Sequence, residues 1–268
     1  MQTLVDGWNN IPAHLNTATK PYLSIVIPAY NEAERLPDTV AAVLEHTRLL
    51  SFGVELLVVD DGSKDDTAAV GESLIPEGKG RVLREPHRGK AAAVLAGMLA
   101  AEGDYVIFMD ADLAVPVADV HRLLQYLEYQ GYGVAIGSRE GTGASRVGEP
   151  ILRHIMGRVY NLIVQIVAVP GINDTQCGFK MFRADVAKDI FPRMRLYTLD
   201  SPIVTGARVT GFDVEVLFLA RRRGYLIKEV PVRWKYGTDS KVSPLRDTWY
   251  NFRDVMRVRL NDMRGRYR

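Results

Sequence analysis

Short runs of branched apolar residues, each followed by a polar loop and a helix-like segment, recur through the first half of the chain. The runs are YLSIVIP at 22–28, VELLVV at 54–59, VIFM at 106–109 and VAI at 134–136. Runs without polar alternation are typical of strands buried on both faces, and their alternation with helices indicates a parallel sheet. We therefore predict an α/β fold in which helices cover both faces of a mostly parallel central sheet.

Polar clusters follow each of these apolar runs. They lie at residues 28–32, 60–61, 110–112 and 137–139. The carboxyl ends of parallel strands meet at one edge of a sheet, which is where open α/β sheets bind their ligands. The clusters are therefore predicted to converge on one site.

Asp110 and Asp112 end the most apolar of the runs. Side chains two residues apart on an extended chain point to the same side, so two carboxylates would face each other at the edge of the core. Repulsion and lost hydration make this unfavourable unless a cation intervenes. Mg²⁺ or Mn²⁺ binds carboxylate and phosphate oxygens, which makes both residues candidate metal ligands. A solvated turn is the open alternative.

Two common nucleotide-binding motifs are absent from the sequence. The first strand is followed by PAYNE at 28–32 instead of a G-x-G-x-x-G motif, and no G-x-x-x-x-G-K-[ST] motif is present. The run HRGK at 87–90 places cations at the start of a predicted helix, where they suit phosphate oxygens or are simply solvated. These features argue against a dinucleotide oxidoreductase and a P-loop NTPase.

At 268 residues and 47% apolar composition, the chain is long enough for one large domain. We predict that domain over residues 21–268, after an N-terminal extension at 1–20 without the layout of a signal peptide. The longest uncharged run, 159–173, is too short and polar for a membrane-spanning helix. The single cysteine, Cys177, excludes an internal disulfide and a cysteine-built zinc site, and a cytoplasmic location is expected.

The net charge of +2 hides an uneven distribution of charge. Residues 221–268 contain 14 Lys and Arg against 5 Asp and Glu, whereas residues 1–220 contain 20 against 27. A basic tail suits an anionic partner such as phosphates, nucleic acid or an anionic membrane face, although a solvated helix face explains it equally well. No nucleic-acid-binding motif accompanies the tail.

The second half has a less regular pattern. Residues 178–182 are strand-like, residues 212–223 and 245–263 are predicted helices, and residues 196–211 are a predicted loop. A further helix at 151–169 is broadly apolar, with its polar residues near one face. Such a helix lies either in a membrane interface or against the core or another subunit.

Seven segments in chain order resemble the family 2 glycosyltransferases of GT-A fold, and within that family the dolichyl-phosphate (polyprenyl-phosphate) β-glucosyltransferases. The segments are SIVIPAYNEAERLP, VVDDGSKDDT, RGKAAA, DAD, GSR, DTQCGFKMF and FDVE. The resemblance implies a Rossmann-like GT-A domain with a nucleotide-binding half at 21–140. Its acceptor half, at 141–268, would carry amphipathic and basic C-terminal helices.

The resemblance also implies an activity, which is inverting transfer of glucose from UDP-glucose to a polyprenyl (dolichyl) monophosphate. Mg²⁺ or Mn²⁺ would be the cofactor, and the protein would associate peripherally with the cytoplasmic face of a membrane. Two alternatives remain open. One is the same fold with another donor, such as GDP-mannose, or another acceptor, and the other is a non-catalytic nucleotide-sugar-binding module.

Residue roles follow from the same resemblance. Asp174 would be the leading base candidate, with orientation of the acceptor as its alternative role, and Asp213 would be the second base candidate. Asp112 would be the more direct metal ligand beside Asp110. The residues expected to bind the nucleotide sugar are Pro28, Tyr30, Glu32, Asp61, Lys90, Asp110, Arg139 and Lys241. Asp61 could alternatively cap the following helix.

Three departures from the family pattern stand out. HRGKAAA at 87–93 replaces the usual Asn-Arg-Gly-Lys-Gly-Gly-Ala, so added methyl groups are expected to affect the backbone approach to the donor. The segment between Phe191 and Phe212 is longer than in the branch and would lie near the acceptor. Eukaryotic relatives carry an N-terminal membrane anchor that this sequence is not expected to contain.

Overall fold

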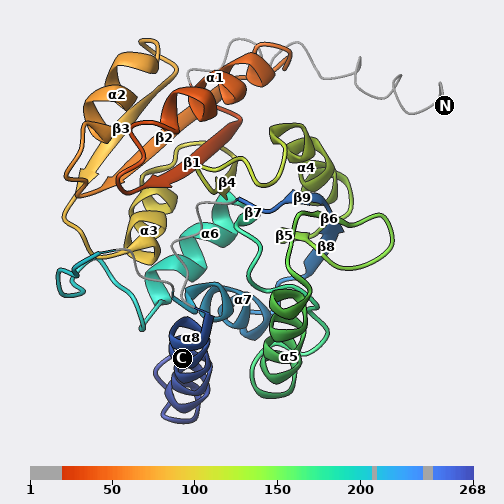
Figure 1. The fold of residues 1–268 in the computed structure, drawn as a ribbon. Helices are drawn as coiled ribbons and strands as arrows, with labels where there is room; N and C mark the ends of the chain where they lie inside the picture. The colour runs from red at the N-terminus through yellow and green to blue at the C-terminus, as the bar shows by residue number, and fades with distance from the viewer. Residues whose placement is uncertain (1–19, 207–209, 238–243) are drawn as a thin grey trace.

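The predicted alternation of strands and helices is present in the computed structural model of the protein, which describes residues 20–206, 210–237 and 244–268 (Figure 1). The first half comprises β1 (Leu23–Ala29), α1 (Leu36–Thr47), β2 (Val54–Asp61), α2 (Thr67–Leu74), β3 (Gly80–Glu85), α3 (Lys90–Ala100), β4 (Tyr105–Met109), α4 (Val120–Tyr129) and β5 (Val134–Ser138). The second half comprises β6 (Ser145–Val147), α5 (Ile151–Val167), β7 (Phe179–Arg183), α6 (Ala184–Ile190), α7 (Phe212–Arg222), β8 (Ile227–Pro231), β9 (Arg233–Lys235) and α8 (Pro244–Met263).

Within the described part of the chain, seven strands form the central sheet in the order β3-β2-β1-β4-β7-β5-β8. Strand β7 is antiparallel to its neighbours β4 and β5, and the remaining neighbours are parallel. The predicted mostly parallel sheet is therefore confirmed. Because β7 lies between two strands of the same direction, the carboxyl ends of β1, β2, β4 and β5 lie along one edge.

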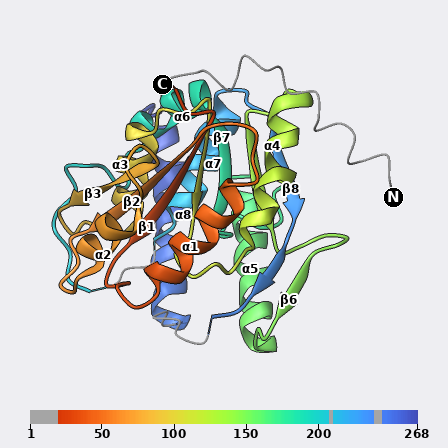
Figure 2. The same ribbon diagram turned by 90° about the horizontal axis from the view of Figure 1, so that it is seen from above.

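Helices cover both faces of this sheet (Figure 2). Ile25 and Ile27 of β1 pack in the cluster that contains the buried faces of α1 and α4. Val26, which points the other way, packs with α3, α6 and α7. The uninterrupted apolar strands of the sequence are thus explained, since each face of the sheet meets a helical layer.

Helix α3 packs unusually close to the sheet. A Cβ atom added at Gly97 would lie 2.3 Å from Val26 Cγ1 and 2.9 Å from Val59 Cγ2, so no larger residue fits there without movement. The alanines of the preceding turns, Ala91 to Ala93, are buried in this layer. The methyl groups that distinguish the chain from the family pattern therefore lie in the core.

The structure adds elements that the sequence pattern did not predict. Strands β6 and β9 form a separate two-stranded parallel sheet, and α6 follows directly after β7. Helix α5 ends at Val167 instead of the predicted Val169. Pro170 explains the earlier end, because a proline disfavours helical backbone in the residue before it.

Helices α5, α7 and α8 lie together at the end of the molecule away from α1 and α2 (Figure 1). Tyr160 and Val164 of α5 share one buried cluster with Val255 and Val258 of α8. The opposite face of α5 is left exposed by the described part of the chain. Its exposed apolar residues are Ile151, Ile155, Val159, Leu162 and Ile166, whose exposed fractions range from 53% to 78%. In the described residues, no helix combines the length and hydropathy needed to cross a bilayer.

Candidate active site

The predicted polar clusters meet at the carboxyl edge of the sheet. Asp61 is the last residue of β2, Asp110 directly follows β4 and Arg139 directly follows β5. The parallel registers of β1 with β2 and with β4 set these strand ends side by side. Side chains that are far apart in sequence therefore share one edge, as the strand pattern predicted.

Asp61 organises the loop that precedes α3. Its buried carboxylate accepts hydrogen bonds from the backbone N–H groups of Arg88 (2.8 Å) and Gly89 (2.9 Å), and it contacts His87 Nδ1 at 2.8 Å. Burial raises the pKa of Asp61 above its ordinary value, while the hydrogen bonds from Arg88 and His87 act against that rise. Asp61 therefore accepts hydrogen bonds from the backbone that leads into α3, whereas the residue at the N-cap of α2 is Asp66.

Tyr30 lies beside this carboxylate, just after β1. Its ring stacks on the imidazole of His87 with a centroid separation of 3.8 Å and an interplanar angle of 1°. An aromatic face next to a buried hydrogen-bonding group is the arrangement on which a nucleobase binds, since a base stacks on the ring and presents polar groups at its edge. Tyr30 and Asp61 thus both contact the His87 ring, and the two residues are called the Tyr30–Asp61 unit below.

Lys90 and Asp110 connect α3 to the end of β4. The Lys90 ammonium forms an ion pair with Asp110 Oδ1. Burial would lower the pKa of Lys90, but the carboxylates of Asp110 and Asp213 outweigh it and hold that pKa above the ordinary value. The ammonium is therefore charged at neutral pH, at a helix N-terminus suited to phosphate oxygens.

Gly178 makes room for the Asp110 carboxylate. A Cβ atom at position 178 would lie 2.1 Å from Asp110 Oδ2, and the Asp110 N–H donates to the Gly178 carbonyl at 3.2 Å. The residue before β7 thus determines where the Asp110 carboxylate sits.

Asp112 lies in the turn after β4. Its Oδ1 accepts the Ala114 N–H at 3.0 Å, and burial together with the nearby charge of Asp110 raises the pKa of Asp112. A divalent cation would relieve this repulsion, and paired carboxylates with phosphate oxygens are the ligands that Mg²⁺ and Mn²⁺ prefer. The donor set fits such a cation, although the described residues contain no cluster of three or more His, Cys, Asp or Glu side chains suited to a metal.

Arg139 and Asp174 form a buried ion pair. Arg139 Nε and Nη2 donate to the two Asp174 oxygens at 2.7 and 2.8 Å, and the Arg139 backbone N–H donates at 2.8 Å. Burial would raise the pKa of Asp174, but the Arg139 guanidinium outweighs it and keeps that pKa well below the ordinary range. Arg139 also lies over the Trp234 ring, 5.2 Å from its centroid. Asp174 is therefore ionised and weakly basic.

Glu229 holds this pair in place from β8. Its carboxylate accepts the backbone N–H groups of Asn173 and Asp174 at 2.9 Å each, and Ser138 Oγ donates to it at 3.1 Å. The loop that carries Asp174 is thus tied to the ends of β5 and β8.

Asp213, the first acidic residue of α7, is bonded to Lys180 of β7. The fully buried Lys180 ammonium also donates to the carbonyl of Cys177 and lies 5.4 Å from the centre of the Phe108 ring. This pair holds the turn next to Gly178, and the charge of Asp213 also helps to raise the pKa of Lys90. Burial raises the pKa of the Cys177 thiol to about 12, which makes it unreactive near neutral pH.

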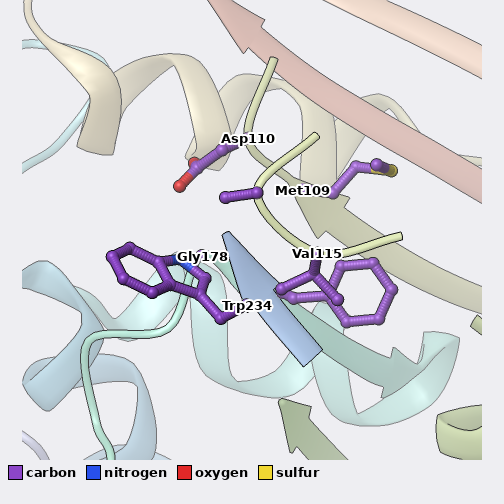
Figure 3. A pocket seen from close by; sticks show the side chains of 7 residues that line it. Met109, Asp110, Val115, Gly178 and Trp234 are labelled. Carbon is purple, nitrogen blue, oxygen red and sulfur yellow. The ribbon is translucent and has the colours of Figure 1, made fainter. Parts of the chain in front are cut away.

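A small pocket opens between these groups (Figure 3). Asp110 and Trp234 lie at the same side of it, with Gly178 between them. The lining residues are Met109, Asp110, Ala114, Val115, Gly178, Phe179 and Trp234. The pocket thus joins the Asp110 carboxylate to the Trp234 indole, over which Arg139 lies.

The other predicted residues are placed as follows. Pro28 lies within β1, and Glu32 precedes α1 and pairs with Arg35 at 2.7 Å. Lys241 lies outside the described residues. The segment expected near the acceptor contacts the loop before α3, since Arg88 Nε donates to the Ser201 carbonyl at 2.8 Å.

Several residues of the site were not singled out in the sequence. His87, Gly178, Lys180, Glu229 and Trp234 each contact a predicted site residue. Lys180 and Gly178 fall within the quoted motif DTQCGFKMF and His87 within the quoted run HRGK, so the sequence already marked the segments of these three residues. Glu229 and Trp234 carry no local signal, because only the tertiary fold brings them to the site.

The chain is similar to known proteins over most of its length. Residues 24–191 match the sequence model described as Glycosyl transferase family 2. The chain is 34% identical over 258 residues to the dolichyl-phosphate beta-glucosyltransferase of Dictyostelium discoideum, covering 91% of this chain and 76% of that protein. It is 31% identical to the human dolichyl-phosphate beta-glucosyltransferase, covering 96% and 81%.

A solved structure shares the fold. Glucosyl-3-phosphoglycerate synthase from Mycobacterium tuberculosis, crystallised with Mn²⁺, UDP and glucosyl-3-phosphoglycerate, superposes with a TM-score of 0.60 at 18% identity. The match covers 91% of this chain and 80% of that one. The predicted GT-A-like architecture is thereby confirmed. The chain belongs to glycosyl transferase family 2, as its ordered motifs indicated.

Proposed function

We propose that the protein transfers glucose from UDP-glucose to a polyprenyl (dolichyl) monophosphate, with inversion at the anomeric carbon. The observation that carries the proposal is the convergence of Lys90, Asp110, Asp112 and Arg139 beside the Tyr30–Asp61 unit. This array offers a base site, cations for a diphosphate and paired carboxylates for a metal. The names of the relatives support the sugar and the acceptor.

The proposed transfer reaction does not require a strong general base. A phosphate monoester has a second pKa of about 6 and is largely dianionic near neutral pH. One of its oxygens attacks the anomeric carbon, the bond from that carbon to the UDP oxygen breaks, and UDP leaves with the bonding electrons. The acceptor therefore needs positioning and the leaving group needs charge stabilisation.

The residues present supply both needs. Lys90 holds positive charge at the N-terminus of α3, where it would meet the donor's phosphates. Asp112 and Asp110 would hold Mg²⁺ or Mn²⁺, which when bound would neutralise charge on the leaving diphosphate. Arg139 Nη1 is not engaged by Asp174 and would contact a phosphate oxygen.

Asp174 had two expected roles, and its geometry favours orientation over proton abstraction. The carboxylate is fully buried, bonded through both oxygens to Arg139 and held at low pKa. We propose that Asp174 positions Arg139, and that Asp213 positions the turn at Gly178 through Lys180.

We further propose that the protein associates peripherally with the cytoplasmic face of a membrane, where a lipid-linked phosphate would be reached. The uncovered apolar face of α5 supports this, because an amphipathic helix binds an interface through such a face. Trp249 and Met263 on α8 are also exposed, and Arg253 and Arg257 are half-exposed on the same helix. Anionic lipid would attract these arginines.

The test of the activity is incubation with radiolabelled UDP-glucose and a short-chain polyprenyl phosphate, followed by extraction into organic solvent. We expect lipid-linked glucose that depends on Mg²⁺ or Mn²⁺ and disappears with EDTA. GDP-mannose and a soluble phosphate acceptor run in parallel separate the alternative donors and acceptors. Absence of turnover with every donor, despite nucleotide binding, would instead support a non-catalytic binding module.

The membrane proposal has its own test. Flotation with vesicles containing anionic lipid is compared for the wild type and for Ile166→Glu on the uncovered face of α5. We expect the variant to lose most of its binding, because a charged side chain replaces one that is 76% exposed and apolar. Tyr129→Glu, on an equally exposed position of α4, is the matched control and is expected to float like the wild type.

A further inference from the structure

One imidazole fills the space beside the Tyr30 ring. His87 stacks on Tyr30 at 3.8 Å, its Nδ1 contacts Asp61 at 2.8 Å, and its Nε2 contacts the Gly206 carbonyl at 3.1 Å. Only 10% of the His87 side chain is exposed. The ring is therefore enclosed between Tyr30 and residues 201–206, with a polar partner at each nitrogen.

The same segment is fastened to the His87–Arg88 backbone. The Val204 N–H donates to the His87 carbonyl at 2.8 Å, and Arg88 Nε donates to the Ser201 carbonyl at 2.8 Å. Residues 201–206 thus form a strap over the loop that begins α3 and leads to Lys90. A movement of His87 would change the contacts of this strap directly.

His87 makes the interactions that a nucleobase would make at this place. A base would stack on the Tyr30 face and would offer a polar edge to Asp61. The imidazole already covers that face and already contacts that carboxylate. The two groups cannot occupy the position together.

We propose that His87 is a gate in the donor site. Its imidazole occupies the base position, and an incoming base displaces it and breaks its contact with Gly206, which loosens the strap at residues 201–206. This inference rests on the proposed nucleotide-sugar donor. The gate lowers the affinity for the donor by the free energy needed to displace the imidazole, and it couples donor binding to residues 201–206.

The test compares UDP binding, in the presence of Mn²⁺, by isothermal titration calorimetry. The proteins are the wild type, His87→Asn and His87→Ala, with His46→Asn as a matched control in the last turn of α1, where its ring packs on His121. Loss of the stacking interaction and of the polar contacts at the two ring nitrogens from the closed state predicts an affinity at least about tenfold higher in both His87 variants. The control is expected to bind like the wild type, and thermal unfolding establishes that each variant is folded.

Hydrogen exchange supplies the second readout. In the wild type, UDP is expected to increase amide exchange in the peptide that spans 201–206, whereas in His87→Ala exchange there is high before UDP is added. Unchanged or weaker UDP binding in folded His87 variants would overturn the gate and leave the proposed donor intact. Absence of UDP binding in the wild type and in all variants would overturn the donor assignment itself, and the gate with it.

Discussion

Replacing Asp174 with Asn tests whether this carboxylate positions Arg139 or acts as a base. The side chain is fully buried and accepts three hydrogen bonds from Arg139. The substitution keeps the shape but removes the charge, which leaves a guanidinium with a side-chain exposure of 16% without its counter-charge. Breaking a buried pair by removing one partner costs about 3–5 kcal/mol.

That free energy corresponds to a fall in Tm of roughly 6–20 °C for a domain of this size. We expect glucosyl transfer to fall as well, because Arg139 loses its fixed orientation. Circular dichroism measures the unfolding, and the organic-extraction assay measures the transfer. Asp185→Asn is the control, since Asp185 forms a comparable pair with Arg183 at the surface, where the expected cost is about 0–1 kcal/mol.

The pH dependence of the effect follows from the sign of the shift. Because the folded-state pKa of Asp174 lies below its unfolded value, the pair stabilises the fold above about pH 4 and loses that contribution as the pH falls through the lowered pKa. The stability gap between wild type and Asp174→Asn should therefore stay constant from pH 8 to 5 and shrink in more acidic solution. A variant with wild-type Tm but no transfer would refute the positioning role and support direct base catalysis.

Three further outcomes are expected. Asp112→Asn should lower transfer by at least about 100-fold and abolish the response to added Mn²⁺, as measured by the extraction assay; a fully active variant would contradict the metal role. Gly178→Ala should weaken UDP binding in calorimetry, because its Cβ would lie 2.1 Å from Asp110 Oδ2 and displace that carboxylate. Cys177, whose pKa is raised to about 12 by burial, should resist a thiol reagent at pH 8.5 until the protein is unfolded; rapid labelling of the native protein would show that the site opens.

Helix α5 shows where prediction from sequence reaches its limit. The sequence indicated a broadly apolar helix with its polar residues near one face, but periodicity does not tell which part of the apolar surface another element covers. The fold buries Tyr160 and Val164 against α8 and leaves Leu162 and Ile166 uncovered. The choice between a core helix and an interfacial helix therefore depended on tertiary packing.

The sequence also did not show which charged side chains pair with one another. Arg139 and Asp174 were both expected at the site, but their three hydrogen bonds to each other and the role of Glu229 were not. Nothing local links residues 139, 174 and 229. The antiparallel insertion of β7 between β4 and β5 also has no signature in a buried apolar run, because strand direction depends on the connections.

The sequence by itself determined the strands and helices of the first half, the edge of the sheet that carries the site, and the carboxylates Asp110 and Asp112 at that edge. Those features follow from hydrophobic periodicity, which is a local property of the chain, and from the rule that strands joined through helices run parallel and end at the same edge of the sheet. The tertiary structure alone decided which charges pair, which apolar face stays exposed and that His87 covers Tyr30. Such contacts depend on distances between residues far apart in sequence, which only the packed fold defines.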